Sequence, residues 1–166
     1  MGNIVSEHLR AVHSSLPLSV AEHIVDEAIA VRTKEGLLPL AIAVLDAGGN
    51  LVAFKREDGV GVLRFDVAFG KAWAALGMGM ATRSIRDRMA SRPAFQSALA
   101  AASDGRFIPV PGGILILDSG GLAIGAVGIS GDASDKDEYC GIHAVKAAGL
   151  QPDPAEPNPE WRAAGL

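Results

Sequence analysis

Between residues 19 and 35 the apolar positions recur at intervals of three and four, as on one face of an α-helix; they are Val20, Ile24, Ala28 and Val31. Ser19 and Glu22 have the spacing of a capping box, in which a hydroxyl and a carboxylate satisfy free amides at a helix start. Gly36 stands where a left-handed residue commonly ends a helix. This pattern predicts an amphipathic helix over about 19–35.

Two pairs of short apolar runs are each interrupted by an Asp-x-Gly-Gly turn, one within about 40–56 and the other within about 113–130. Asp46 and Asp118 begin these turns, and glycine supplies the positive φ that a tight hairpin needs. Turns this short cannot hold a crossover connection, so the four strands must pair antiparallel. Because the runs are almost continuously apolar, we expect both faces of the sheet to be covered, in large part by another subunit.

Three further segments have helical composition: about 63–78, one or two short helices within 82–102, and about 134–148. Together with the hairpins they predict an α/β (α+β) fold, in which helices flank an antiparallel sheet of four to five strands. The tail, 151–166, holds four prolines and no periodic pattern. We therefore expect a single domain over 1–150, followed by an arm or a disordered end.

The helix over 63–80 is apolar on more than one face, which is typical of a buried helix. Its two apolar stripes consist of Phe65, Phe69, Trp73 and Leu76, and of Val67, Ala74, Met78 and Ala81. A domain of this size has few other elements that could bury both stripes. We therefore predict a homo-oligomer with two-fold symmetry elements.

Composition and charge argue against several classes of function. The net charge is −4 at pH 7, whereas a nucleic-acid binder normally presents a basic face, so we expect no nucleic-acid partner. The sequence has no run of about 18 apolar residues, so we expect no membrane partner either. The single cysteine, Cys140, cannot form an internal disulfide, and the reducing cytoplasm is the simplest location.

The four histidines do not form a helical zinc motif, because no two of them have the spacing that such a motif requires. A neutral imidazole is also a natural axial ligand of haem iron, and three histidines are candidates for that role: His13, His23 and His143. For each of them the alternative is an ordinary surface or core histidine. The sequence does not choose among these interpretations.

Charged residues near the predicted strand ends form a second candidate site. Arg56 and Asp58 close the second strand, and Lys71 lies in the apolar helix that follows. If the second and third strands are neighbours, Gly112 and Gly113 start the third strand at the same end of the sheet. These residues would then line a cationic, amide-rimmed pocket for a ligand that carries a carboxylate. Surface ion pairs without a ligand are the alternative.

Within that pocket Lys71 is the candidate base or Schiff-base former, because desolvation by Phe69 and Trp73 would favour its neutral form. Asp58 would orient Lys71 or exchange protons with it. The glycine-rich run 125–131 is another candidate for anion binding, since it leads into the last helix. Close packing of strands explains its glycines as well, and we favour that interpretation.

Six short motifs occur in order along most of the chain: Leu45-Asp46-Ala47-Gly48-Gly49, Arg56-x-Asp58-Gly59, Gly70-Lys71-Ala72, Pro111-Gly112-Gly113, the run from Gly125 to Gly131, and Asp137-Glu138. Together they resemble the GlcG/HbpS-like family, which includes the C-terminal domain of PduO-type proteins. The resemblance covers about 17–150.

The resemblance implies a profilin-like sandwich, assembled into homo-oligomers of up to eight copies. Some members bind haem, and others are found among genes for the catabolism of small acids. Two further residues become ligand-binding candidates: Asp137, which lies in one of the motifs, and Asn50, which stands where members commonly carry His or Lys. Family resemblance implies the fold more strongly than the function.

Three hypotheses for the function follow. The first is a small-ligand-binding protein whose ligand is haem. The second is an enzyme that acts on a small carboxylated or hydroxylated metabolite through Lys71, Arg56 and Asp58. The third is an oligomer without chemistry, because most candidate residues also have a structural explanation.

Overall fold

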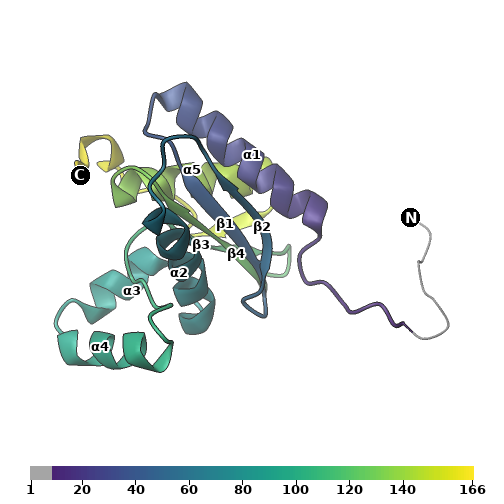
Figure 1. Ribbon diagram of the computed structural model, residues 1–166, viewed down its shortest axis with the longest axis horizontal. Coiled ribbons are helices and arrows are strands. Elements are labelled where there is room, and N and C mark those ends of the chain that lie inside the picture. The colour runs from purple at the N-terminus through teal and green to yellow at the C-terminus, as the bar shows by residue number, and fades with distance from the viewer. Residues whose placement is uncertain (1–8) are drawn as a thin grey trace.

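A five-stranded antiparallel sheet, in the order β2-β1-β4-β3-β5, forms the centre of the protein (Figure 1). The computed structural model describes residues 9–166. The strands are β1 (Ala41–Asp46), β2 (Leu51–Arg56), β3 (Gly113–Leu117), β4 (Ala123–Ser130) and β5 (Gln151–Asp153). The helices are α1 (Leu18–Glu35), α2 (Leu63–Met78), α3 (Thr82–Met89), α4 (Pro93–Ala102), α5 (Ser134–Ala147) and the short 3-10 helix η1 (Trp161–Ala163). The predicted α+β class and antiparallel sheet are confirmed.

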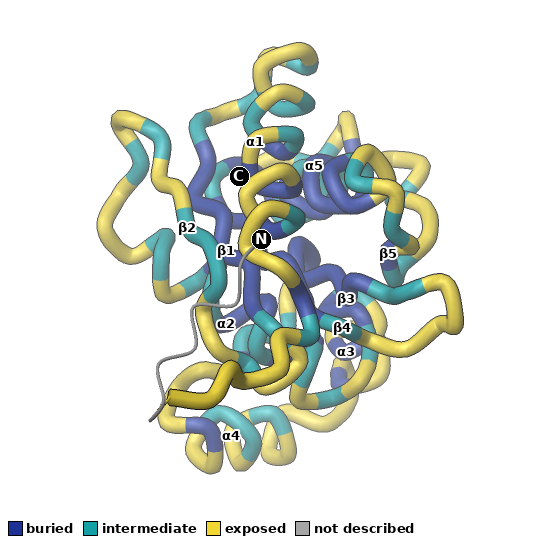
Figure 2. Tube along the Cα trace, turned by 90° about the vertical axis from the view of Figure 1, so that its right-hand side faces the viewer, coloured by how far each residue is buried: buried dark blue, intermediate teal, exposed yellow. Residues whose placement is uncertain are grey.

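The helices cover both faces of the sheet (Figure 2). α1 and α5 pack side by side on one face, and α2 lies on the other, with α3 and α4 packed beside it. The helices of the chain itself therefore lie on both faces, and a contribution from another subunit stays a prediction. None of the helices in residues 9–166 is long and apolar enough to cross a membrane.

Large aliphatic side chains fill the space between the sheet and the layer of α1 and α5. The central strands contribute alternate residues, and each helix contributes its inward stripe. The largest members of this cluster are Leu16, Ile24, Leu40, Ile42, Ile114, Ile116, Ile129 and Ile142. Removal of this apolar surface from water is the main force that holds the two layers together.

Small residues form the closest contacts of the opposite interface, between the sheet and α2. Ala68, Ala72 and Ala75 recur at helical spacing on the side of α2 that faces the sheet, and all three are fully buried. A β-carbon at Gly128 would overlap the carbonyl oxygen of Ala68, so only glycine lets the helix approach the strand this closely. Lys71 belongs to the same stripe, and α2 therefore brings a charged side chain to the sheet.

The two Asp-x-Gly-Gly turns have the same structure, as their shared sequence predicts. In each turn the aspartate Oδ1 accepts two amide hydrogen bonds of 2.8 or 2.9 Å. The fourth residue of each turn has a left-handed φ, of 79° at Gly49 and 80° at Gly121. The aspartate and the last glycine therefore determine these hairpin turns locally.

α1 begins one residue before the predicted capping box. Pro17 is its N-cap and no side chain caps the helix, so the predicted contact between Ser19 and Glu22 is not formed. Because the helix starts at Leu18, Ser19 already lies inside the first turn. The predicted end is confirmed, since Gly36 has a left-handed φ of 66°.

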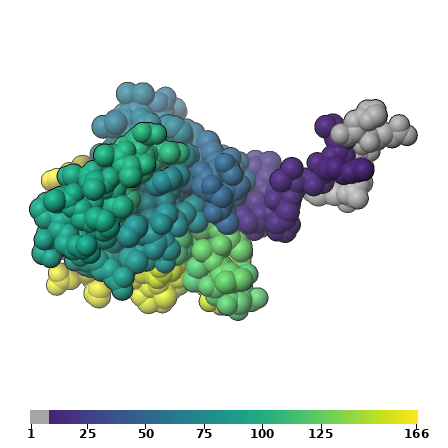
Figure 3. All heavy atoms as spheres, turned by 90° about the horizontal axis from the view of Figure 1, so that it is seen from below, coloured from purple at the N-terminus to yellow at the C-terminus, as the bar shows by residue number. Residues whose placement is uncertain are grey.

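Residues 9–14 form an extended arm that projects from the body, as Figures 1 and 3 show. The arm joins the body just before α1. There Leu16 is buried, and the Ser15 Oγ accepts a hydrogen bond of 2.9 Å from the amide of Ala47. Ser15 and Leu16, which follow the arm, therefore belong to the packed fold.

The C-terminal segment 151–166 is not a disordered end. Its first residues form β5, which pairs antiparallel with β3. Trp161 is buried and stacks on Tyr139 with 3.7 Å between ring centroids, and Arg162 forms an ion pair of 2.6 Å with Glu35. Prolines exclude a helix here but are compatible with a short edge strand, which carries no helical or alternating pattern.

Both apolar stripes of α2 pack against other parts of the chain, but their large side chains are only half-buried. Phe69, Trp73 and Leu76 pack against the cluster between α2 and the sheet. Ala74 and Met78 join a second cluster that includes residues of α3 and α4. The chain therefore covers both stripes only in part, and the homo-oligomer remains a prediction.

Candidate functional site

A buried ion pair lies where α2 passes the end of β4. The Lys71 Nζ donates hydrogen bonds to the Asp137 Oδ2 at 2.9 Å and to the carbonyl oxygen of Ile129 at 2.8 Å. The Asp137 Oδ1 accepts a hydrogen bond of 3.0 Å from the amide of Asp132. Lys71 is 1% exposed and Asp137 is 0% exposed. These contacts connect α2, the end of β4 and the start of α5.

Gly112 and Gly113 lie directly beside this ion pair. A β-carbon on Gly112, which has a φ of +112°, would lie 2.9 Å from the Lys71 Nζ. A β-carbon on Gly113 would overlap the carbonyl oxygen of Lys71. The Thr82 Oγ1 fixes Gly113 further, since it accepts from the Gly113 amide at 2.9 Å and donates to the Gly113 carbonyl at 3.2 Å. The two glycines therefore make room for α2 and its lysine.

Burial and the ion pair act on Asp137 in opposite directions. Desolvation raises the pKa of Asp137 from its ordinary 3.8 to about 6, and the charge and hydrogen bond of Lys71 offset part of that increase. At neutral pH the carboxyl group is therefore mostly ionised and paired with Lys71, and it gains a proton in mildly acidic solution.

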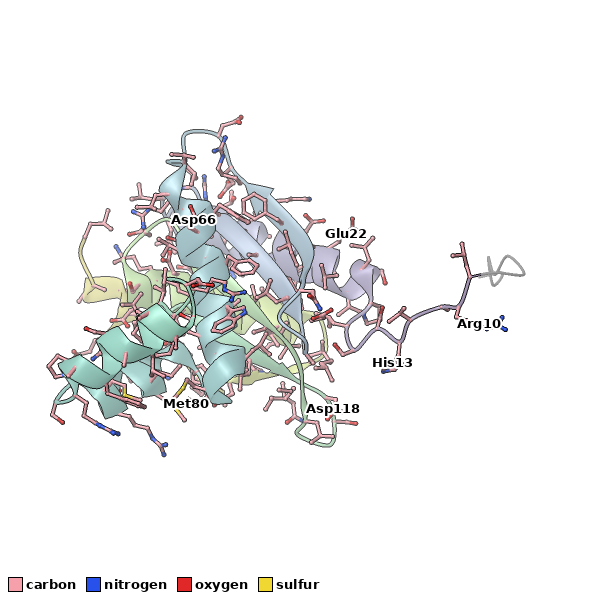
Figure 4. The ribbon with its side chains drawn as sticks, turned by 60° about the horizontal axis from the view of Figure 1, so that its bottom comes forward. Arg10, His13, Glu22, Asp66, Met80 and Asp118 are labelled. Carbon is pink, nitrogen blue, oxygen red and sulfur yellow. The ribbon has the colours of Figure 1, made fainter. Side chains whose placement is uncertain are left out.

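A cavity of about 210 Å³ lies at the same end of the sheet, near the start of α2. Figure 4 marks this first turn of α2 by Asp66, and it marks the opposite end of the sheet by Asp118, at the tip of the second hairpin. We refer to the cavity as the Arg64 pocket; its lining residues are Leu38, Pro39, Gly59, Val60, Gly61, Arg64 and Gly131.

The buried ion pair binds the backbone segment that forms one wall of the Arg64 pocket. Gly131 lies between Ile129, whose carbonyl binds Lys71, and Asp132, whose amide binds Asp137. Arg64 contacts the same segment, because its Nη1 donates to the Ser130 Oγ at 3.1 Å. The backbone over 129–132 is therefore fixed from both sides.

Arg56 and Asp58 lie outside this group. They line a separate, open cavity of about 460 Å³ with residues of α1 and β2. The last residue of β2 and the first residue of β3 are at the same end of the sheet, as expected. In the sheet, however, β1 and β4 lie between these two strands. Three strand spacings, about 14 Å, therefore separate the end of β2 from the start of β3, and two, about 10 Å, separate it from the end of β4, where the ion pair lies. The acidic partner of Lys71 is Asp137 rather than Asp58.

Asn50 lies in the first hairpin turn, at the opposite end of β1 from Lys71. Its side-chain amide donates to both carboxylate oxygens of Asp46 at 3.2 Å, and the residue is exposed. In this structure Asn50 stabilises the turn, and the structure does not bring it together with the other predicted site residues.

Glu138 is a second buried acid, which the sequence analysis named only as part of a motif. It is 0% exposed, and neither of its carboxylate oxygens has a hydrogen-bond partner among the described residues. The Arg83 Nη1 of α3 lies 3.2 Å from its Oε2. Desolvation raises the pKa of Glu138 from 4.5 to about 7, and Arg83 opposes this effect. Two adjacent acids of α5 therefore titrate close to neutral pH.

The three candidate haem ligands lie on different parts of the chain. His13 projects from the N-terminal arm (Figure 4), and His23 is exposed on α1. His143 is half-buried, with its ring centroid 4.3 Å from that of Tyr139, and burial lowers its pKa. Cys140 is fully buried, and burial raises the pKa of its thiol. Residues 9–166 contain no cluster of three or more His, Cys, Asp or Glu that could hold a metal ion.

The sequence analysis missed Arg64, although a local signal was present. Arg64 follows Gly59 and Gly61 and opens a helix, an arrangement that favours an anion site. Arg56, eight residues earlier, has the same charge and was chosen instead. Only the observed strand order shows that Arg64, and not Arg56, lies beside the buried ion pair.

Comparison with known proteins supports the fold. An uncharacterised 15.0 kDa protein from the dhaT-dhaS intergenic region of Citrobacter freundii is 28% identical over 111 residues, which are 67% of this chain and 77% of that protein. The solved PduOC:heme complex superposes with a TM-score of 0.73 at 23% identity, covering 81% of this chain and 96% of that one. Klebsiella pneumoniae ORFY superposes with a TM-score of 0.72 at 25% identity, covering 87% and 97%.

The matching family covers strands β1 to β4, the main helices and the buried ion pair. Its description is haem-degrading protein HbpS-like, and the match spans residues 16–146. Lys71, Gly112, Gly113 and Asp137 all lie within this span, whereas β5 and η1 follow it. Because the match covers well over half of the chain, the protein belongs to the HbpS-like family.

Proposed function

We propose that the protein binds a small molecule that carries a carboxylate, and that the Arg64 pocket receives this carboxylate. The observation that carries the proposal is a half-buried arginine on a cavity whose other walls are glycine backbone and apolar side chains. A guanidinium group can form two parallel charge-assisted hydrogen bonds with a carboxylate. The start of α2 adds the positive end of a helix dipole.

The size and lining of the pocket restrict the ligand. A cavity of about 210 Å³ is below the usual range for drug-sized ligands, roughly 300–1,000 Å³, and suits an acid with a few heavy atoms. Leu38, Pro39 and Val60 offer contacts to a short hydrocarbon portion. The proposed ligand is therefore a short-chain organic acid.

In this proposal Lys71 is a positioning residue. Both hydrogen bonds of its Nζ go to protein groups, and the side chain is 1% exposed. Lys71 and Asp137 hold the backbone over 129–132, and a pre-organised wall reduces the entropy lost when a ligand binds. A direct chemical role for Lys71, as the enzyme hypothesis requires, would need Lys71 to leave Asp137.

Calorimetric titration of the purified protein tests the Arg64 pocket. The probes are acetate, propionate, glycolate and pyruvate, with propionamide as the neutral control. Arg64→Met should weaken acid binding by roughly tenfold to 150-fold, because a charged hydrogen bond contributes about 1.5–3 kcal/mol. Arg56→Met is the matched control, since Arg56 lines the separate cavity, and it should leave the affinity unchanged. Equal affinities for wild type and Arg64→Met would overturn the proposal.

Borohydride trapping separates the positioning role from the enzyme hypothesis. Pyruvate is added to the protein with borohydride, and Lys71 is examined by peptide mass spectrometry. A reduced adduct on Lys71 would support Schiff-base chemistry. An unmodified Lys71, in a protein that binds pyruvate, supports the positioning role.

Family membership favours haem as a second candidate ligand, but the described part of one chain does not fit it well. The Arg64 pocket is too small for a porphyrin, and the cavity of about 460 Å³ is open and lined by charged residues. No histidine or cysteine of residues 9–166 lines either cavity. His13 and His23 are exposed and lie outside any apolar slot.

Hemin titration tests this second candidate. A saturable Soret shift would establish binding, and His→Ala substitutions at 13, 23 and 143 would then identify an axial imidazole. If none of the three variants loses the shift, the described histidines are not ligands. The same samples give the molar mass by light scattering, where a monomer at micromolar concentration would contradict the predicted homo-oligomer.

A further inference from the structure

β2 forms one edge of the sheet, and no other strand of residues 9–166 pairs with its outer side. A groove of about 240 Å³ lies between this edge and the first half of α1. Its walls are Leu18, Glu22 and Val25 of α1 and the four consecutive residues 52–55 of β2. Because neighbouring side chains of a strand point to opposite faces, a groove that touches four residues in a row follows the edge of the strand. We call it the β2 groove.

The N-terminal arm begins beside this groove. Leu18, the first residue of α1, lines the groove, and residues 9–14 extend away from the body a few residues earlier (Figure 1). Two large apolar side chains of the arm face water, since Leu9 is 66% exposed and Val12 is 90% exposed. Six extended residues span about 20 Å, and the six residues of β2 span the same length. The arm therefore has the length and the exposed apolar side chains of a strand that lacks a neighbour.

The charges of the arm and of the groove are complementary. Glu22 is exposed on the α1 side of the groove, and no ion pair within residues 9–166 includes it. Lys55, on the other wall, is already paired with Asp26. The arm carries Arg10, which has no acidic partner in the described part of the chain and is labelled with Glu22 in Figure 4. The unpaired charge of the groove is therefore negative, and that of the arm is positive.

The residues between the arm and α1 direct the arm away from its own groove. The Ser15 Oγ accepts a hydrogen bond from the amide of Ala47, Leu16 is buried, and Pro17 has an extended backbone. The chain therefore leaves the body beside the first hairpin turn, and Figures 1 and 3 show that the arm continues outward from there. A second copy, related by a two-fold axis near the start of α1, can receive this arm in its own β2 groove and give its arm in return.

We propose that residues 9–14 of one copy bind as an added strand along the β2 edge of a second copy, and that the two copies exchange their arms. Main-chain hydrogen bonds between the arm and β2 supply the attachment. Alternate side chains of a strand share one face, so Arg10 and Val12 enter the groove together. There Val12 contacts the apolar wall at Val25, and Arg10 pairs with Glu22.

The exchange covers both exposed features at once, which favours a second copy over an unrelated strand. An unprotected sheet edge can pair with strands from other molecules, and an extended arm with apolar side chains is one such strand. An unrelated peptide would cover the edge but leave the arm in water. Because each copy uses one arm and one groove, the contact closes with two copies and does not grow into a fibre.

Sedimentation velocity over a range of protein concentrations measures the exchange. Any N-terminal tag is removed first, because a tag would extend the arm. Wild type should self-associate, and Val12→Asp should raise the concentration at which half of the chains are associated by roughly tenfold or more, since it brings a charge to an apolar wall. Leu122→Asp is the matched control, because Leu122 is 71% exposed in the second hairpin turn, and it should have no effect.

A charge exchange tests the pair of Arg10 and Glu22. Arg10→Glu and Glu22→Arg should each weaken self-association by roughly threefold to tenfold, because two exposed ion pairs in the dimer are replaced by like charges. The double variant should recover most of the wild-type affinity. Glu27→Arg, on the same helix but outside the groove, is the control for the charge alone and should leave self-association unchanged.

Disulfide trapping identifies which copy holds the arm. The double variant Val12→Cys with Val52→Cys is oxidised with diamide, and the native Cys140 does not interfere because it is fully buried. Exchange of arms gives a covalent dimer on a non-reducing gel. Each single variant, treated in the same way, should remain largely a monomer on the gel.

Three results would overturn the proposal. A wild-type monomer at every concentration tested would mean that no exchange occurs. A covalent monomer in which both new thiols are lost would place the arm in its own groove. Unchanged self-association in Val12→Asp, which alters only an exposed residue of the arm, would assign the contact between copies to another surface.

Discussion

The two faces of the sheet are packed in different ways. α1 and α5 meet one face through large aliphatic side chains, whereas α2 makes its closest contacts with the other through its alanines and a glycine of β4, beside larger residues such as Leu45 and Leu115. Two adjacent residues of β4 illustrate the contrast. Ile129 belongs to the aliphatic cluster, and Gly128 touches the backbone of α2 at Ala68. Aliphatic packing can relax around a small change, but contact between two backbones cannot.

This difference explains where the candidate site lies. The ion pair of Lys71 and Asp137 depends on the close approach of α2, because Gly112 and Gly113 leave no space between strand and helix. The Arg64 pocket opens at the start of the same helix. The functional groups are thus positioned on the face that α2 covers. Most of the buried apolar surface lies on the face that α1 and α5 cover.

The largest expected effect comes from Gly128→Ala. The new β-carbon would overlap the Ala68 carbonyl oxygen, so α2 would have to move away from the sheet. We expect a loss of more than about 4 kcal/mol in the free energy of unfolding, or no folded protein. Ile129→Val, one residue away on the aliphatic face, should cost only about 1 kcal/mol. Urea unfolding measures both, and similar losses would contradict the proposed difference between the faces.

Lys71→Met should have the next largest effect. It leaves Asp137 buried without its cationic partner, and breaking a buried ion pair commonly costs about 3–5 kcal/mol. The double variant Lys71→Met with Asp137→Asn should be more stable than the single variant, because no charge then remains uncompensated. A single variant as stable as wild type in urea unfolding would show that the pair contributes little.

Glu138→Gln should change how stability depends on pH. The pKa of Glu138 is raised from 4.5 to about 7 in the folded state, so its contribution to stability is complete below pH 4.5 and is lost as the pH rises through 7. Glu138→Gln has no carboxyl group to ionise at this position, so it does not lose stability in this way as the pH rises. Relative to wild type it should therefore gain stability between pH 4.5 and 8, on the order of 3 kcal/mol at most.

Thermal unfolding in a series of buffers measures this difference. A constant offset between Glu138→Gln and wild type across the range would show that Glu138 does not titrate in the folded protein near neutral pH. Exposed Glu160, replaced by Gln, is a suitable control.

The smallest effect is expected for Asp118→Ala, which belongs to neither face. It removes the two amide hydrogen bonds of the second hairpin turn and should cost about 1–2 kcal/mol. Because the turn lies at the far end of the sheet from the Arg64 pocket, acid binding should stay unchanged in calorimetric titration. A loss of binding would mean that the site responds to general stability and not to the packing of α2.

Local signals predicted most of the fold. Gly36 and the two aspartate turns act through their own backbone, so the hairpins and the end of α1 could be read without knowledge of distant contacts. Lys71 could be singled out because a charge inside an apolar helix is unusual. β5 could not be predicted, since its three residues have no periodicity and form a strand only by pairing with β3.

Long-range placement limited the prediction of the site. Asp137 is 66 residues from Lys71, and nothing local to either residue indicates their contact. Arg56 was grouped with Lys71 because the ends of β2 and β3 were expected to be neighbours. The order β2-β1-β4-β3-β5 arises from strand pairing across the chain, and it places Arg64 rather than Arg56 beside the buried pair.

The short β5 has a consequence for how the protein behaves in concentrated solution. It covers the outer edge of β3, and its middle residue, Pro152, has no amide hydrogen to offer a further strand. Without residues 151–166 the sheet would end in β3, whose unpaired backbone groups could template strands from other molecules and start aggregation. An affinity tag therefore belongs on the projecting N-terminal arm, where it leaves this protective edge intact.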